Sequence, residues 1–173
     1  MGISSALGGY VPPGLVLIKT QTVGTAVSSV PVSDVFSASY DNYKIIYQNG
    51  VSSANGELTL VFGSTNTGYY NTVLYGAWSN SPTPLAAGAA NASTLAFAGC
   101  ADPDGAFLDL DVRNPYLARR TTIAGPFVGM DSDRVGAYTA GYVANTTSYT
   151  SFTIGTSTGT ITGGTIRVYG YRN

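Results

Sequence analysis

The chain has 173 residues and a hydrophobic fraction of 44%, so it is long enough and apolar enough for one domain with its own core, and it is not a disordered segment. A net charge of −1, with no basic run longer than Arg119-Arg120, excludes nucleic-acid binding through phosphate neutralisation. No apolar stretch approaches the length of about 18 residues that a membrane-spanning helix needs. We therefore expect neither nucleic acid nor membrane as a partner.

The first 13 residues are small and Gly-rich and end in Pro12-Pro13. We interpret residues 1–13 as an N-terminal arm, with Ile3 and Leu7 as the apolar anchors that would contact a neighbouring protein. The alternative is that this terminus is disordered. Residues 14–173 are expected to form a single β-sandwich domain.

From Gly14 onward the pattern is that of strand after strand, joined by Gly, Asn, Asp and Pro turns. Pro31 marks an edge strand or a bend, and Asn49-Gly50 predicts a turn that ends one strand. The Ala-rich stretch 82–93 contains prolines and a glycine, which favour a loop over a helix. About ten strands are predicted, within segments 15–19, 26–36, 42–50, 57–63, 72–78, 93–99, 106–114, 120–130, 135–145, 148–156 and 164–171.

No segment shows an apolar stripe of helical period with caps, so the crossover helices that parallel sheets need are missing. The chain is therefore predicted to be all-β, an antiparallel jelly-roll-type β-sandwich. Alternation with a period of two residues assigns one face of several strands to the core. The predicted core residues are Leu58, Leu60, Phe62, Leu108, Leu110, Phe152, Ile154, Ile166 and Val168.

The side chains available for chemistry are few. The sequence has no histidine, one Glu, one Cys and two Lys, which removes the commonest general base and metal ligand. We expect no enzymatic activity and no cofactor. Cys100 is expected to be a buried thiol of a protein that folds in a reducing cytosol.

One stretch, "ADPDGAFLDLD" (101–111), carries four carboxylates, those of Asp102, Asp104, Asp109 and Asp111. A tight turn with several hard oxygens is what Ca²⁺ binds. Asp-Pro-Asp-Gly is also an ordinary turn sequence, and the spacing does not fit an EF-hand. The turn is the preferred interpretation, with a calcium site as the alternative.

The sequence contains 13 tyrosines, whose apolar rings and polar tips suit both strands and interfaces. In the last predicted strand Ile166 and Val168 take the core face, which leaves the other face to Arg167, Tyr169 and Tyr171. We predict that these three residues form an interface, together with Tyr138 and Tyr142 from a neighbouring strand. A low surface charge leaves little repulsion between copies and favours self-association.

Two end segments carry a resemblance: "GLVLIKTQTVGTAVSSVPVSDVFSASYDNYKIIYQNG" (14–50) and "TGTITGGTIRVYGYRN" (158–173). They resemble the corresponding parts of small structural proteins of tailed bacteriophages. The resemblance implies a virion β-sandwich module, commonly trimeric, that is assembled in the cytoplasm of the bacterial host. Only 13 residues precede the sandwich, which fits a capsid decoration (cement) protein bound to the major capsid protein better than a complete fibre. The alternative is a receptor-binding tail-fibre module that recognises host glycans.

Overall fold

The computed structural model describes residues 14–78, 83–130 and 134–172. These ranges are built from β-strands and their connections and contain no α-helix. The predicted arm, with Ile3 and Leu7, lies outside the described residues. In chain order the strands are β1 (Leu15–Thr22), β2 (Ser29–Val32), β3 (Asn42–Ser52), β4 (Gly56–Phe62), β5 (Tyr69–Ala77), β6 (Leu85–Ala92), β7 (Leu95–Asp102), β8 (Gly105–Arg113), β9 (Thr122–Met130), β10 (Arg134–Val143), β11 (Phe152–Thr156), β12 (Ile161–Thr162) and β13 (Thr165–Tyr171).

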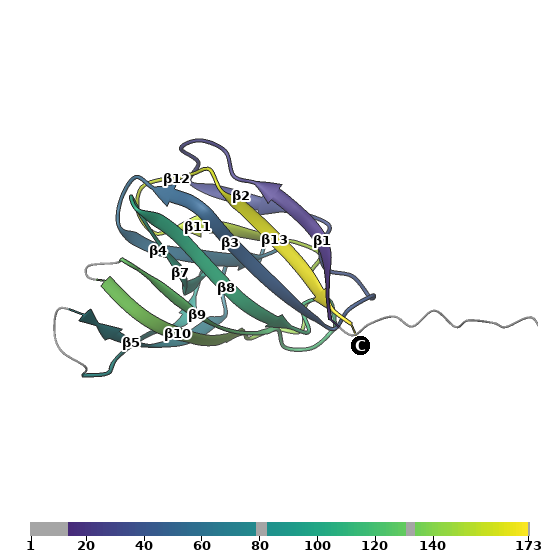
Figure 1. Ribbon diagram of the computed structural model, residues 1–173. Helices are drawn as coiled ribbons and strands as arrows, with labels where there is room; N and C mark the ends of the chain where they lie inside the picture. The colour runs from purple at the N-terminus through teal and green to yellow at the C-terminus, as the bar shows by residue number, and fades with distance from the viewer. Residues whose placement is uncertain (1–13, 79–82, 131–133, 173) are drawn as a thin grey trace, which may run out of the picture.

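Two four-stranded antiparallel layers face each other across the core (Figure 1). One has the order β1–β13–β3–β8 and the other the order β2–β11–β4–β7, and the β7–β8 hairpin joins them. The chain alternates between the layers from β1 to β4, and β11 of the second layer is followed by β12 and β13, which both pair with β3 of the first layer. The predicted all-β antiparallel class is confirmed, and jelly-roll topology is our interpretation of this strand order.

Two further hairpins extend the first layer. β9 pairs with the C-terminal half of β8, β10 pairs with β9, β5 pairs with β10, and β6 is the outer edge. In Figure 1 these strands form the lower part of the molecule. The two hairpins are far apart in sequence but lie side by side, because β5 and β10 pair along nine residues.

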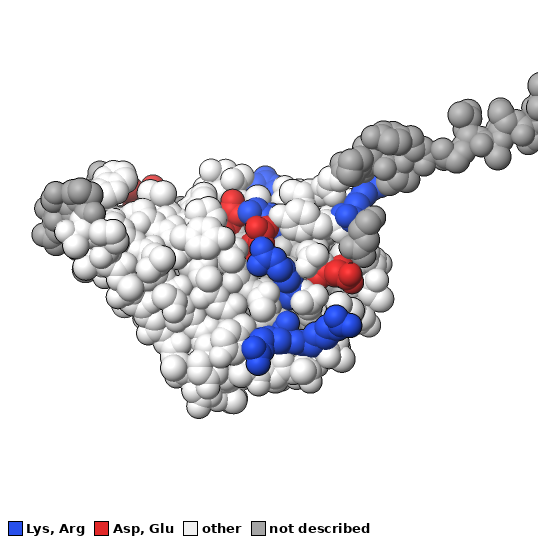
Figure 2. Space-filling model, turned by 90° about the horizontal axis from the view of Figure 1, so that it is seen from below, with Lys and Arg blue, Asp and Glu red and all other residues white. Residues whose placement is uncertain are grey.

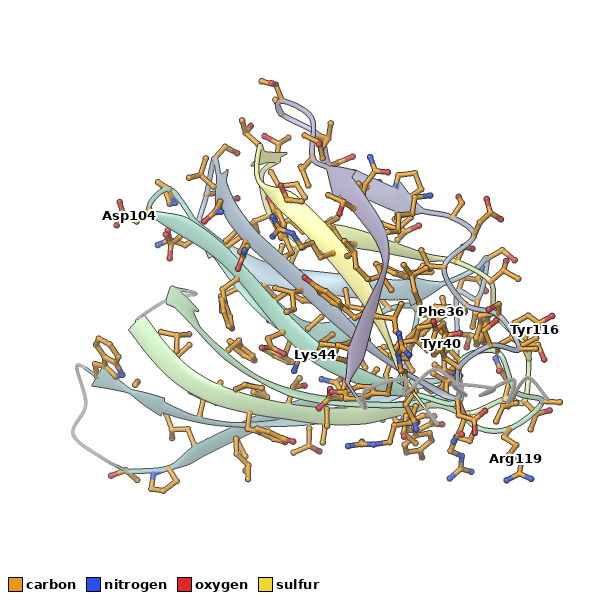
Figure 3. The ribbon with its side chains drawn as sticks, turned by 45° about the vertical axis from the view of Figure 1, so that its right-hand side comes forward. Phe36, Tyr40, Lys44, Asp104, Tyr116 and Arg119 are labelled. Atoms are coloured by element: carbon orange, nitrogen blue, oxygen red, sulfur yellow. The ribbon has the colours of Figure 1, made fainter. Side chains whose placement is uncertain are left out.

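All nine predicted core residues are buried, none with more than 1% of its surface exposed. They come from both layers, so burial of the two inner faces is what holds the sandwich together. At one end of the core Phe36 packs edge-on against Tyr43, with ring centroids 4.8 Å apart, and also contacts Phe152 at 5.7 Å. Phe36 and Tyr40 mark this end in Figure 3, and Asp104 lies at the opposite end.

Four tyrosines are buried in this core, and the hydroxyl groups of three of them find backbone partners there. Tyr43 donates to the Ser37 carbonyl, Tyr47 donates to the Gly163 carbonyl, and Tyr69 accepts from the amide of Phe62 at 2.8 Å. A buried hydroxyl without such a partner would cost about 1–3 kcal/mol. These three tyrosines therefore serve the core of the sandwich and do not form an outer interface.

Two local predictions were wrong. β3 does not end at Asn49-Gly50, because Asn49 takes a left-handed conformation (φ 62°) in an irregularity between Tyr47 and Gly50 and the strand continues to Ser52. The stretch 82–93 contains a strand, since β6 pairs with β5 from Leu85 to Ala92. In both places pairing with a neighbouring strand outweighs local turn and loop preference. Pro31 does lie in an edge strand, one of the two predicted alternatives, because among the described strands β2 pairs with β11 alone.

Among the described residues there is no helix with the length and apolar character needed to cross a bilayer. Cys100 is buried, as predicted.

Candidate functional site: the outer sheet face and a cleft at its end

The last strand has the predicted phase. Ile166 and Val168 are buried, whereas Arg167, Tyr169 and Tyr171 lie on the opposite, outer face and are half-buried. β13 is not an edge, since β1 covers one side of it and β3 the other. The outer face of β13 is therefore part of a broad sheet surface that runs from β1 to β6.

A small polar cluster lies in the middle of that surface, where β3, β8 and β13 are neighbours. Lys44 forms ion pairs with Asp109 and with Asp111, the second at 3.5 Å. The Tyr171 hydroxyl donates to Oδ1 of Asp111 at 2.6 Å. Burial, followed by this hydrogen bond to a carboxylate, raises the pKa of Tyr171 to about 12. The Tyr171 hydroxyl is thus held within the fold and is not free for a partner protein.

The structure does not bring all the predicted interface residues together. Tyr138 and Tyr142 are on β10, which is separated from β13 by β3, β8 and β9. At about 4.8 Å between strands, β10 is roughly 19 Å from β13 along the sheet. The prediction that the two sets of residues lie on neighbouring strands was therefore wrong, although both sets lie on the same sheet.

The two tyrosines of β10 also differ in what surrounds them. Tyr142 stacks on Tyr70 with ring centroids 5.1 Å apart, and the Arg120 guanidinium lies 4.6 Å from the Tyr142 ring centre. Tyr138 is 53% exposed. Its cross-strand partners are Leu74 on β5 and Pro126 on β9. Tyr138 is therefore the described member of the predicted set that is most available for contact with another protein.

The outer face around Tyr138 is apolar. Leu74 is 60% exposed and Val128 56% exposed. We call Leu74 and Tyr138 the β5–β10 patch. Arg134 is the single charged residue in the sequences of β5, β6, β9 and β10. Figure 2 shows the underside of the molecule with a broad uncharged area, while charged side chains gather to one side.

A second apolar patch lies at the other end of the same sheet. Leu15 and Leu17 on β1 are about half exposed and face Tyr171 and Tyr169 of β13 in the strand register. We call these four residues the β1–β13 patch. Sequence reasoning found its two tyrosines but missed its leucines. It also missed Leu74 and Val128, because their segments are apolar in both phases and show no inward and outward alternation.

The acidic stretch 101–111 divides into two unrelated parts. Oδ1 of Asp102 accepts hydrogen bonds from the amides of Asp104 at 2.7 Å and Gly105 at 2.9 Å. These bonds are those of an ordinary turn, which was the preferred interpretation of this sequence. Asp109 and Asp111 belong to the Lys44 cluster on the outer face. Within the ranges that the structure describes, no three acidic, His or Cys side chains are grouped as a metal ion would need.

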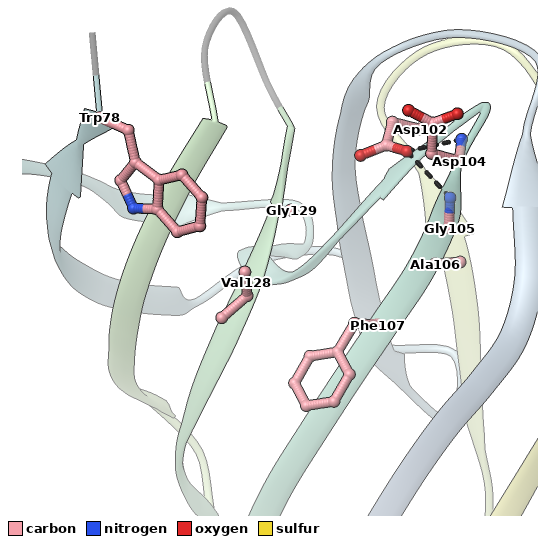
Figure 4. Close-up of a pocket in the computed structure, with 8 residues that line it drawn as sticks. All are labelled: Trp78, Asp102, Asp104, Gly105, Ala106, Phe107, Val128 and Gly129. Atoms are coloured by element: carbon pink, nitrogen blue, oxygen red, sulfur yellow. Dashed lines mark hydrogen bonds between the residues drawn. The ribbon is translucent and has the colours of Figure 1, made fainter.

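A cleft opens where β8 and β9 separate. Among the described residues the two strands pair from Asp111–Ala124 to Arg113–Thr122, and farther along β9 passes over the β7–β8 hairpin, with Gly125 against Asp109 and Gly129 against Cys100. This crossing depends on glycine, since a Cβ at Gly125 would overlap the Asp109 carbonyl oxygen and a Cβ at Gly129 would overlap Cys100. The cleft has a volume of about 380 Å³ and is lined by Trp78, Asp102, Asp104, Gly105, Ala106, Phe107, Val128 and Gly129 (Figure 4).

The cleft has an apolar side and an acidic end. Trp78, the single tryptophan of the sequence, is 67% exposed at one side of it. In Figure 4 Val128 and Phe107 lie between Trp78 and the turn that carries Asp102 and Asp104. The acidic turn could be recognised in the sequence as a candidate site. No local sequence pattern indicated that Trp78 would lie in the same cleft.

No family model, curated protein or solved structure matches the chain. The fold is therefore described from its own strand order, and function is argued from the surface and the cleft.

Proposed function

We propose that this protein is a non-enzymatic structural protein of a bacteriophage virion, and that it acts as a decoration (cement) protein on the outer surface of the capsid. The observation that carries the proposal is the outer sheet face, which exposes two apolar patches on a rigid sandwich. Exposed apolar groups of this kind mark protein interaction sites. The resemblance of segments 14–50 and 158–173 to phage structural proteins supports the virion as the location, and the major capsid protein as the partner.

The chemistry of the side chains also favours a structural role. The sequence has no histidine to act as a general base. Asp102 is engaged by turn amides, and Asp109 and Asp111 are paired with Lys44. Three of the four carboxylates in the stretch 101–111 are thus occupied by structural contacts, and Asp104 is the fourth. This arrangement supports the expectation that the protein is not an enzyme.

The location is tested by measuring the copy number of the protein in purified particles of the virus that encodes it, using quantitative mass spectrometry. A decoration protein should be present in hundreds of copies and should bind again to capsids from which it has been removed. A few dozen copies or fewer, found in the tail fraction, would place the protein in the tail and overturn the decoration role.

We further propose that the protein self-associates as a homotrimer. The number three comes from the resemblance, and the surface supports self-association. Two different patches on one subunit allow a head-to-tail contact, in which the β5–β10 patch of one copy covers the β1–β13 patch of the next and the ring closes. Such a contact needs at least about 1,000 Å² of total buried area to be stable.

Light scattering on the purified protein tests this association. Three subunits of 17.8 kDa predict a particle of about 53 kDa. The double substitution Leu74→Ser and Tyr138→Ser should lower the mass to that of the monomer without unfolding it, because both side chains are more than half exposed. An unmutated protein that stays at about 18 kDa would rule out a self-sufficient trimer.

A mixing experiment separates a ring from a two-fold dimer. Leu15→Ser with Leu17→Ser disrupts the β1–β13 patch, and Leu74→Ser with Tyr138→Ser disrupts the β5–β10 patch. In a ring each variant alone is monomeric, but an equal mixture keeps one intact pair of patches and gives a dimer. If the mixture stays monomeric, the contact is not formed between these two patches.

A second candidate function is host recognition through surface glycans, as in a receptor-binding tail-fibre module. The specific observation that favours it is the exposed Trp78 beside the carboxylates of the cleft. An aromatic ring at the mouth of a concave site is a feature of ligand binding and is not required by the fold.

A further inference from the structure

We propose that the cleft between β8 and β9 is a binding site for an uncharged saccharide, with Trp78 as the stacking platform and Asp104 as the acceptor for sugar hydroxyl groups. The proposal deepens the second candidate function and names its ligand class. The volume of the cleft, about 380 Å³, lies in the range of small-molecule sites, toward the lower end. A short oligosaccharide segment is the kind of ligand that such a space accommodates.

The exposure of Trp78 is the first argument. Indole is the largest apolar side chain, and at 67% exposure it leaves most of its ring in contact with water. The core does not need this ring, because Trp78 belongs to neither buried cluster of the structure. The apolar C–H face of a pyranose ring can cover an exposed indole, and Val128 and Phe107 extend the same apolar wall.

The acidic end supplies the polar half of the site. Oδ1 of Asp102 is engaged by the turn amides, which fixes the hairpin. Asp104 contributes its backbone amide to that turn, and its exposed carboxylate points outward from it (Figure 4). A carboxylate held on a rigid turn is a strong acceptor for hydroxyl groups.

The charge and the shape of the cleft restrict the ligand. Two carboxylates and no Lys or Arg are among the described residues that line it, so an anionic sugar would be repelled. Arg119 lies at the opposite end of the molecule (Figure 3). A compact cation would bind an aromatic ring and a carboxylate together. Here Trp78 and the acidic turn are at opposite sides of the cleft, which favours an extended ligand with an apolar face and hydroxyl groups.

The single tryptophan makes the test direct, since all indole fluorescence comes from Trp78. The full-length protein is titrated with soluble glucose-, galactose- and mannose-based oligosaccharides, and with a sialylated oligosaccharide and tetramethylammonium for comparison. We expect a saturable blue shift with at least one uncharged oligosaccharide and none with the sialylated one. No saturable shift up to about 10 mM, or a response to tetramethylammonium alone, would overturn the proposal.

Variants measured by calorimetry complete the test. Trp78→Ala should weaken binding by about tenfold or more, because it removes the aromatic contact. Asp104→Asn should weaken it several-fold and leave the turn intact, because Asp104 takes part in the turn through its amide. Val51→Ala, an exposed apolar change on β3 outside the cleft and both patches, is the control and should bind normally. Equal binding by Trp78→Ala and the unmutated protein would contradict the proposal and leave the structural role on the particle unaffected.

Discussion

Replacing Leu108 by Ala is expected to destabilise the domain by about 2–5 kcal/mol, and replacing Leu110 should have an effect of the same size. Both side chains are completely buried between the two layers. Leu108 faces Tyr47 across the β3–β8 ladder, and Leu110 faces Ile45. Truncation leaves a cavity that the packed neighbours cannot fill, so the lost contacts and the cavity both lower the free energy of unfolding.

Denaturant unfolding measures this effect as a lower midpoint with an unchanged slope. Val51→Ala is the control, because Val51 is on β3 of the same layer, lies outside both patches and is 38% exposed. Its effect should stay within about 0.5 kcal/mol. If Leu108→Ala and Val51→Ala unfold at the same denaturant concentration, the inner and outer faces of the first layer have been assigned wrongly.

Raising the pH from 10 to 12 is expected to remove about 5 kcal/mol of stability through two buried tyrosines. Burial raises the pKa of Tyr47 and of Tyr69 to about 12 from the ordinary 10.0. Their neutral forms are favoured in the folded protein, so this stabilisation is complete below pH 10. Above pH 10 the unfolded chain releases these protons first, and the stability falls until the pH passes about 12. Each shift of about two units corresponds to roughly 2–3 kcal/mol.

Unfolding experiments at a series of alkaline pH values, with phenolate absorbance as a second signal, measure this loss. Tyrosine ionisation and unfolding should coincide. Tyr47→Phe removes one of the two groups, so its stability should fall less steeply with pH. At neutral pH the variant should be less stable by about 1 kcal/mol, because the hydrogen bond from Tyr47 to the Gly163 carbonyl is lost. The same pH slope for both proteins would show that Tyr47 does not contribute.

The inner faces could be predicted from the sequence wherever apolar and polar residues alternate. In 106–112 the alanine, leucines and valine occupy one phase and the aspartates the other, so the burial of Leu108 and Leu110 follows from the two-residue period of a strand. The same reasoning predicted the burial of Ile166 and Val168. It could not predict which face of β5 is buried, because apolar residues occur on both faces of that strand. It also failed for β6, whose small residues have weak preferences and become a strand by pairing with β5.

The sequence by itself determined the all-β class, the core phase of the alternating strands and the scarcity of catalytic side chains, because these depend on residue type and local period. Only the tertiary structure decided which outer residues share a surface. Sheet order places three strands between Tyr169 on β13 and Tyr138 on β10. The crossing of β9 over the β7–β8 hairpin, which glycines at 125 and 129 permit, opens the cleft that brings Trp78 and Asp104 together. Strand order and crossing follow from contacts between residues far apart in the chain, and no local pattern encodes them.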